Sequence, residues 1–188
     1  MKKIILLTMI ISLICITCAC SKKVNVTYEE DYSKYTKTDT LHKQTEEEIT
    51  FIEKLKTEQT EEFFGEHTTV NFLTVKETQD VLEHGTGVIL FANIDSLSDE
   101  NKITISNFIE SAQGAAYPIN YYGTGNEADD KKILKKLNGS ITDFNNPIVI
   151  FLKEGQITSI KNINEIASDN QKEIYQIFKQ EVYKTLTE

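Results

Sequence analysis

Apolar positions recur along the chain with two different periods, and the change of period separates the expected strands from the expected helices. Short, nearly continuous apolar runs predict buried strands at residues 70–75, 88–94, 118–122, 147–152 and 157–160. Apolar residues three or four positions apart predict helices over residues 45–66, 76–84, 99–113, 129–137 and from about 168 to the end. The predicted order after residue 67 is therefore strand, helix, strand, helix, strand, helix, strand, strand, helix.

Residues that favour helix starts and turns support this order. Thr45 is followed by Glu48 in a capping-box sequence, and Ser98 precedes two acidic residues. The segment Lys153-Glu154-Gly155-Gln156 predicts a tight turn, so the last two strands should form a hairpin. Helices between the earlier strands predict crossovers. Together these features favour an α/β fold in which helices cover both faces of a mixed sheet.

The amino terminus has the pattern of an export signal. Lys2 and Lys3 precede an uncharged, mostly apolar stretch of about 17 residues (IILLTMIISLICITCAC), which is short for a spanning helix of roughly 20 residues. Its end, Thr17-Cys18-Ala19-Cys20, resembles the bacterial lipobox, in which a cysteine after a small residue receives a diacylglycerol. An uncleaved membrane anchor and ordinary secretion remain alternatives.

This resemblance implies that Cys20 is the lipidated residue, with Cys18 as the alternative. Residues 1–19 are then a lipoprotein signal peptide, and the protein is expected to be lipid-anchored in the cell membrane, facing the extracytoplasmic side. Residues 20–44 are polar and aperiodic, which favours a flexible tether, although their tyrosines leave open a partner-binding segment that orders on contact. Residues 45–66 form an expected N-terminal helical extension, and residues 67–188 the main domain.

The charge and cysteine content exclude several classes of function. The chain has 20 lysines, no arginine, 29 acidic residues and a net charge of −9, which disfavours nucleic-acid binding. Loss of Lys2 and Lys3 with the signal changes the net charge to −11. All three cysteines lie at or before residue 20, so the domain has no thiol for disulfide formation.

From Val70 to Glu188 the chain resembles the thioredoxin family. The resemblance is carried by VILFANIDSLSDENK, a buried strand that leads into a helix start, and by NPIVIFLKEGQI, a strand that opens with Asn146-Pro147. More narrowly, the chain is similar to the divergent thioredoxin-like proteins known as bacteriocin transport accessory proteins of low-GC Gram-positive bacteria. The resemblance implies a thioredoxin-like mixed sheet with flanking helices, here preceded by an N-terminal helix and a lipoprotein signal.

The chain departs from the redox members of that family at their active-site motif. Asp95, Ser96, Leu97 and Ser98 stand where those members carry Cys-x-x-Cys. Thiol–disulfide exchange needs a thiolate, so redox activity is not carried over. Neither Asp95 nor Ser98 has a histidine base in a recognisable triad context, and turn and N-cap roles are expected for them. We therefore expect no enzymatic activity, no cofactor and no metal site.

In the family, the proline that matches Pro147 follows a cis peptide bond and faces the start of the active-site helix. The resemblance therefore implies a peptide-binding groove between Asn146-Pro147 and residues 95–98, working by strand addition. The alternative is that Pro147 only begins a strand. Gly123-Thr124-Gly125-Asn126 has two glycines of a phosphate-binding fingerprint and no following Lys-Ser/Thr, so it is interpreted as a loop.

These observations favour a non-catalytic thioredoxin-like lipoprotein that acts as a binding or accessory module. Its expected partner is a secreted peptide or a membrane transport complex. One alternative is a thiol–disulfide-type enzyme of the same family. The other is an immunity or structural lipoprotein that acts through its N-terminal segment.

Overall fold

The computed structural model describes residues 43–59, 70–166 and 168–187, so the expected signal peptide and most of the expected tether lie outside it. Its helices and strands are α2 (Glu46–Gln59), β1 (Val70–Phe72), α3 (Val75–His84), β2 (Gly87–Ala92), η3 (Ile94–Ser96), α4 (Asp99–Gly114), β3 (Ile119–Gly123), α5 (Glu127–Lys136), β4 (Ile148–Lys153), β5 (Gln156–Asn162), η4 (Ile163–Glu165) and α6 (Gln171–Thr187). This order of strands and α-helices confirms the predicted α/β arrangement.

The five strands form one mixed sheet in the order β1-β3-β2-β4-β5. β1, β3 and β2 are parallel, whereas β4 runs antiparallel to β2, and β5 antiparallel to β4. The carboxyl ends of the three parallel strands therefore lie at one end of the sheet. The turn between β4 and β5 lies at the opposite end, which we call the hairpin end.

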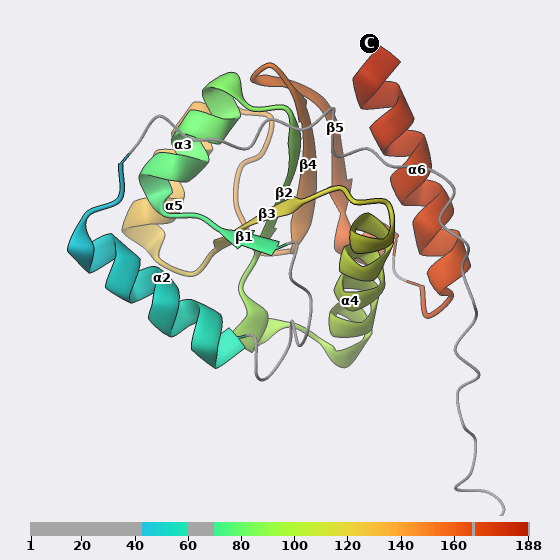
Figure 1. Ribbon diagram of the computed structural model, residues 1–188, viewed down its shortest axis with the longest axis horizontal. Coiled ribbons are helices and arrows are strands. Elements are labelled where there is room, and N and C mark those ends of the chain that lie inside the picture. The colour runs from blue at the N-terminus through green and yellow to red at the C-terminus, as the bar shows by residue number, and fades with distance from the viewer. Residues whose placement is uncertain (1–42, 60–69, 167, 188) are drawn as a thin grey trace, which may run out of the picture.

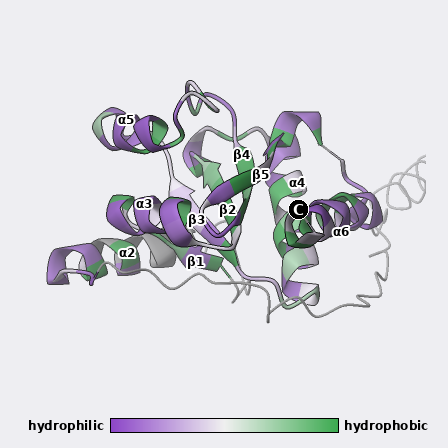
Figure 2. Ribbon diagram, turned by 90° about the horizontal axis from the view of Figure 1, so that it is seen from above, coloured by the Kyte–Doolittle hydropathy of each residue, from purple (hydrophilic) through white to green (hydrophobic). Residues whose placement is uncertain are grey.

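Helices cover both faces of the sheet (Figure 1). α4 and α6 pack on one face. There the ring of Phe178 makes edge-to-face contacts with Phe108, at a centroid distance of 5.5 Å, and with Tyr117, at 5.6 Å. α3 and α5 pack on the other face, where Val81 and Ile133 join a second buried apolar cluster. Figure 2 shows the hydrophobic strands between these two helical layers. Because both faces are covered, β2 is buried along its whole length.

Capping residues move two element boundaries away from their predicted positions. β1 ends at Phe72 and not at residue 75, because Thr74 is the N-cap of α3 and forms a capping box with Glu77. α5 begins at Glu127 and not at residue 129, because the Asn126 side chain accepts hydrogen bonds from two backbone N–H groups of its first turn. At Thr45 and Ser98 the predicted caps are confirmed.

α2 packs against the main domain. Ile52 is only 4% exposed and belongs to the core cluster that contains β1 and α4 side chains. Just before α2, the Gln44 amide donates to the buried Glu77 carboxylate over 2.8 Å. Lys76 Nζ lies 3.9 Å from Glu48 Oε1, which links α3 to α2. The N-terminal helix is thus part of the folded unit as far as Gln59, and the predicted continuation over 60–66 lies outside the described residues.

No helix in the described ranges has the length and apolar character that crossing a bilayer requires.

Candidate functional site

The carboxyl ends of β1, β2 and β3 open into a hollow of about 840 Å³. The chain leaves β2 toward α4 on one face of the sheet, but it leaves the neighbouring β3 toward α5 on the other face. Segments that diverge in this way leave room between them, and open α/β sheets commonly bind ligands at this point. The topology therefore places the candidate site here.

A smaller hollow of about 410 Å³ adjoins the first. Asn93, after β2, and Thr124, after β3, line both hollows and form the junction between them. The far wall of the smaller hollow is the loop 143–145 before β4. The ring of Phe144 stacks on that of Phe91 with centroids 5.0 Å apart, which holds this loop against β2. We refer to the two hollows together as the crevice.

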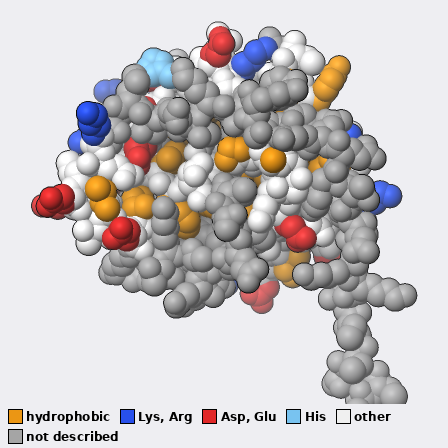
Figure 3. All heavy atoms as spheres, viewed as in Figure 1, with side chains coloured by type: hydrophobic (Ala, Val, Ile, Leu, Met, Phe, Trp, Pro, Cys, Tyr) orange, Lys and Arg blue, Asp and Glu red, His pale blue; other side chains and the backbone are white. Residues whose placement is uncertain are grey.

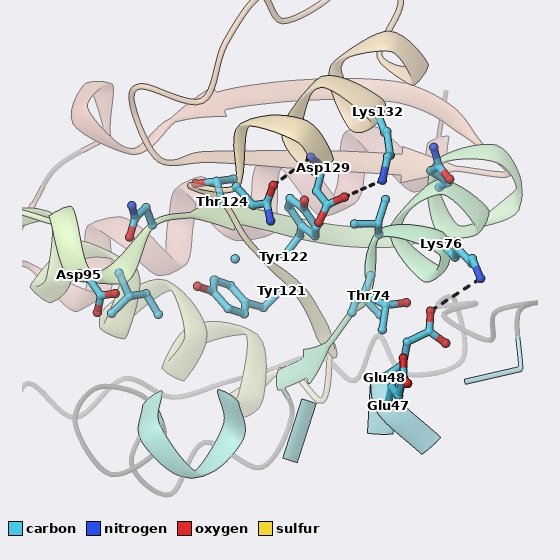
Figure 4. A pocket seen from close by; sticks show the side chains of 17 residues that line it. Glu47, Glu48, Thr74, Lys76, Asp95, Tyr121, Tyr122, Thr124, Asp129 and Lys132 are labelled. Atoms are coloured by element: carbon cyan, nitrogen blue, oxygen red, sulfur yellow. Dashed lines mark hydrogen bonds and ion pairs between the residues drawn. The ribbon is translucent and has the colours of Figure 1, made fainter. Parts of the chain in front are cut away.

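Two tyrosines from β3 lie in the middle of the larger hollow (Figure 4). The Tyr121 hydroxyl donates to the carbonyl oxygen of Ala92 over 3.0 Å. The Tyr122 hydroxyl donates to Asp130 over 3.3 Å. Burial, reinforced by the negative charge of Asp130, raises the pKa of Tyr122 well above its ordinary value. The Tyr122 phenol is therefore neutral, and both hydroxyls are held by the hydrogen bonds that they donate.

The lysines that line the crevice are all paired with carboxylates. Lys132 lies 2.7 Å from Asp129, Lys131 lies 2.6 Å from Glu127, and Lys76 makes the longer contact with Glu48. Figure 4 shows the Lys132 and Lys76 pairs at some distance from Asp95, which lies at the other end of the larger hollow. Elsewhere on the described surface seen in Figure 3, charges of both signs are interspersed around a band of hydrophobic side chains.

The structure brings part of the expected degenerate motif to the crevice. Asp95 is exposed and lines the larger hollow, whereas Ser96 lines the smaller one and donates to the Asn93 carbonyl oxygen over 3.0 Å. Leu97 packs on the core. Ser98 accepts a hydrogen bond from the backbone of Asn101 and caps α4, as predicted. Only the first two residues of the motif thus face the candidate site.

The structure corrects the expectation for Pro147. The Asn146–Pro147 peptide bond is trans, since the described residues contain no cis peptide bond. Pro147 is buried at the start of β4, and its carbonyl accepts from the Ile163 N–H over 2.9 Å. The Asn146 side chain accepts a hydrogen bond from the Asn164 amide over 2.8 Å, and neither residue lines the crevice. The trans form is the default for X–Pro bonds, and the resemblance had wrongly favoured cis. Peptide binding by Asn146 and Pro147 stays a prediction.

Sequence reasoning missed the residues at the junction. The segment 123–126 is not only a connecting loop, because the Thr124 N–H donates to Ala92 over 3.0 Å and the Gly125 N–H donates to Asp130 over 2.9 Å. The Thr124 hydroxyl is buried without a hydrogen-bond partner among the described residues. Position directly after a buried parallel strand was the available signal, but neighbouring strands cannot be identified before the sheet order is known.

His84, the one histidine among the described residues, does not line the crevice. His84 lies at the end of α3, and His42 and His67 fall outside the described residues. Within the described ranges, no group of three or more His, Cys, Asp or Glu side chains is arranged to hold a metal ion.

In comparisons with known proteins, no family model, no curated protein and no solved structure matches this chain. Its function is therefore inferred from its own residues and geometry.

Proposed function

We propose that the protein is a non-catalytic thioredoxin-like lipoprotein on the outer face of the cell membrane, where it acts as a binding or accessory module for a secreted peptide or a transport complex. The strand order β1-β3-β2-β4-β5, with the last two strands antiparallel, supports the thioredoxin-like part of this proposal. The position of residues 95–98 between β2 and α4 supports it as well.

The observation that carries the binding role is the crevice itself. It lies where thioredoxin-like redox proteins are expected to act, yet Asp95 and Ser96 occupy it in place of cysteines. No cysteine occurs anywhere between residues 21 and 188, so this domain has no thiolate to attack a disulfide. A preformed hollow with an apolar floor and a few polar groups is typical of a binding site.

Site-specific photocrosslinking in the native cell tests the binding role. A photoreactive residue at exposed Ser96 should capture a specific peptide or membrane protein. The same residue at Tyr183 on α6, which is 66% exposed, should give only background. Equal capture from both positions, or no capture from position 96, would contradict the proposal.

Labelling with a radioactive fatty acid tests the anchor separately. The proposal requires that Cys20→Ala abolishes incorporation of the label and releases the protein from the membrane, while Cys18→Ala leaves both unchanged. The reverse result would show that Cys18, and not Cys20, is the lipidated residue. Labelling of neither cysteine in the wild-type chain would refute the lipoprotein assignment.

A further inference from the structure

The junction of the crevice holds two polar side chains that have no hydrogen-bond partner among the described residues. Thr124 is only 9% exposed, and its hydroxyl has no hydrogen-bond partner among the described residues. The Asn93 side-chain amide, which lies beside Gly125, likewise makes no hydrogen bond in the described part of the chain. A buried hydroxyl without a partner is unfavourable, so a ligand that hydrogen-bonds to it would be bound more tightly.

The groups at the junction match the hydrogen-bonding needs of a peptide backbone. Every peptide unit presents one N–H donor and one C=O acceptor. The Asn93 amide can donate and accept at the same time, and the Thr124 hydroxyl can do either. Because Asn93 and Thr124 line both hollows, an extended chain that crosses the junction would reach both of them.

The charges around the crevice indicate which side chains such a peptide would carry. Among the described lining residues, seven are acidic and three are lysines, and each lysine is already paired with a carboxylate. Five of the seven carboxylates lie in the first turns of α2 or α5, where acidic residues favour the helix dipole: Glu47, Glu48, Glu127, Asp129 and Asp130. The remaining two are Asp95, which lies in the three-residue η3, and Asp143, which lies in the loop before β4.

Asp95 and Asp143 line different hollows of the crevice. Asp95 lies in η3 at the end of the larger hollow that is farther from the Lys76 pair (Figure 4). Asp143 lines the smaller hollow, in the loop that Phe144 attaches to β2. Neither carboxylate forms an ion pair with another described residue. The Asp143 carboxylate accepts hydrogen bonds from the Asn145 N–H over 3.0 Å and from the Thr142 hydroxyl over 3.4 Å, which orient it without supplying a positive charge. A cationic group of a ligand would therefore find, in each hollow, a carboxylate that has no described cationic partner.

We infer that the crevice binds an extended peptide whose backbone hydrogen-bonds to Asn93 and Thr124 and whose Lys or Arg side chains lie near Asp95 and Asp143. This inference rests on the proposed binding function, because it names the ligand of the same module. It assigns the contacts to the junction and to two carboxylates, and Asn146-Pro147 is not needed for them.

Selection from a peptide library tests the inference. The full chain, in a zwitterionic detergent, is exposed to displayed random peptides of about ten residues, a length that spans several strand repeats. Peptides enriched over the empty support should be rich in Lys and Arg. Their affinity, measured by fluorescence anisotropy, should fall between about 50 mM and about 300 mM salt, since screening weakens exposed ion pairs.

Matched variants locate the contacts. Asp95→Asn and Asp143→Asn should each weaken an enriched peptide about threefold, as expected for partly exposed ion pairs. Thr124→Val keeps the shape but removes the hydroxyl, and should weaken binding about fivefold. Glu154→Gln makes the same charge change at the hairpin end and should leave the affinity unchanged. Circular dichroism of each variant checks that it is folded.

The outcomes separate this inference from the proposed function. If enriched peptides show no preference for cations, or if Asp95→Asn and Asp143→Asn bind like Glu154→Gln, the cationic-peptide inference is overturned while a binding function stands. If no peptide is enriched over the empty support and position 96 captures nothing in cells, both are overturned.

Discussion

The two ends of the sheet differ in how completely their polar groups are paired. At the hairpin end, the Gly155 N–H donates to Gly85 over 2.8 Å and the Glu154 N–H donates to the Thr86 hydroxyl over 2.9 Å. At the crevice end, the Thr124 hydroxyl and the Asn93 amide have no partner among the described residues. At the hairpin end, these polar groups are therefore paired with each other within the folded domain. The crevice end keeps two polar side chains that no described residue pairs with, which is expected where a ligand binds.

A substitution at Gly155 should break the hairpin end most severely. Gly155 has a φ of +78°, and an added Cβ would overlap the Glu83 carbonyl oxygen of the backbone. We expect Gly155→Ala to lower the free energy of unfolding by about 3 kcal/mol, because strain in the left-handed region and a backbone clash add together. Urea denaturation measures the change.

Gly139→Ala is the control for the clash. Gly139 has a similar φ of +83°, but nothing lies within 4 Å of the added Cβ. Only the backbone strain remains, so the expected loss is about 1 kcal/mol. Equal losses for the two variants would show that the close approach to Glu83 does not stabilise the hairpin end.

At the crevice end, the largest effect should come from detaching α2. Ile52→Ala removes buried side-chain atoms and should cost about 2 kcal/mol. It should also increase hydrogen exchange along α2, whose first turn lines the larger hollow. Ile49→Ala, at a position that is 41% exposed, should change stability by less than about 0.5 kcal/mol. If Ile52→Ala were equally mild, α2 would not be a fixed wall of the crevice.

The same substitution at the two ends should have opposite effects on stability. Thr86→Val removes the acceptor of the Glu154 N–H and should lower the free energy of unfolding by about 0.5–1 kcal/mol. Thr124→Val removes a buried hydroxyl that has no partner in the described part of the chain, and should raise the free energy of unfolding by about 1 kcal/mol. Thermal unfolding of the pair measures both changes. A destabilised Thr124→Val variant would mean that the fold does use this hydroxyl.

The smallest effect is expected at the side of the sheet, between β5 and α6. Lys161 Nζ lies 2.8 Å from Glu181 Oε1. Burial of the carboxyl opposes ionisation, but the hydrogen bond and charge of Lys161 prevail and hold the pKa of Glu181 below its ordinary value of 4.5. A lowered folded-state pKa stabilises the fold above the ordinary value, and this contribution is lost as the pH falls through the folded value.

Glu181→Gln therefore should flatten the dependence of stability on pH in the acidic range and leave little difference from the wild type near the folded-state pKa. Urea denaturation between about pH 3 and pH 7 measures this. An unchanged acidic slope would show that the ion pair does not contribute.

The local sequence predicted most of the fold because its signals are local. The caps Thr45 and Ser98 mark helix starts through contacts only three residues long, and the turn at Glu154-Gly155 follows from its own backbone preferences. The end of β1 was predicted wrongly because Thr74, the N-cap of α3, lies inside an apolar run. The start of α5 was predicted wrongly because Asn126 was not recognised as its N-cap.

The candidate site was only half predicted from the sequence. Asp95 and Ser96 were found because they follow a recognisable strand. Asn93 and Thr124 were not, although each is the residue directly after its strand, β2 or β3. The proposed role of Pro147 depended on a peptide-bond geometry that the sequence does not encode locally, and the structure has the other isomer.

By itself, the sequence determined the α/β order of elements, the absence of cysteine after Cys20 and the presence of Asp95-Ser96-Leu97-Ser98 after the second strand. Only the tertiary structure decided that β2 and β3 are neighbours, that α2 closes one wall of the hollow, and that Thr124 is buried beside Asn93. The physical reason is the distance along the chain over which each kind of contact acts. Caps, turns and apolar periods act over a few residues, whereas the crevice is made by strand pairing and helix packing between segments about 30 residues or more apart.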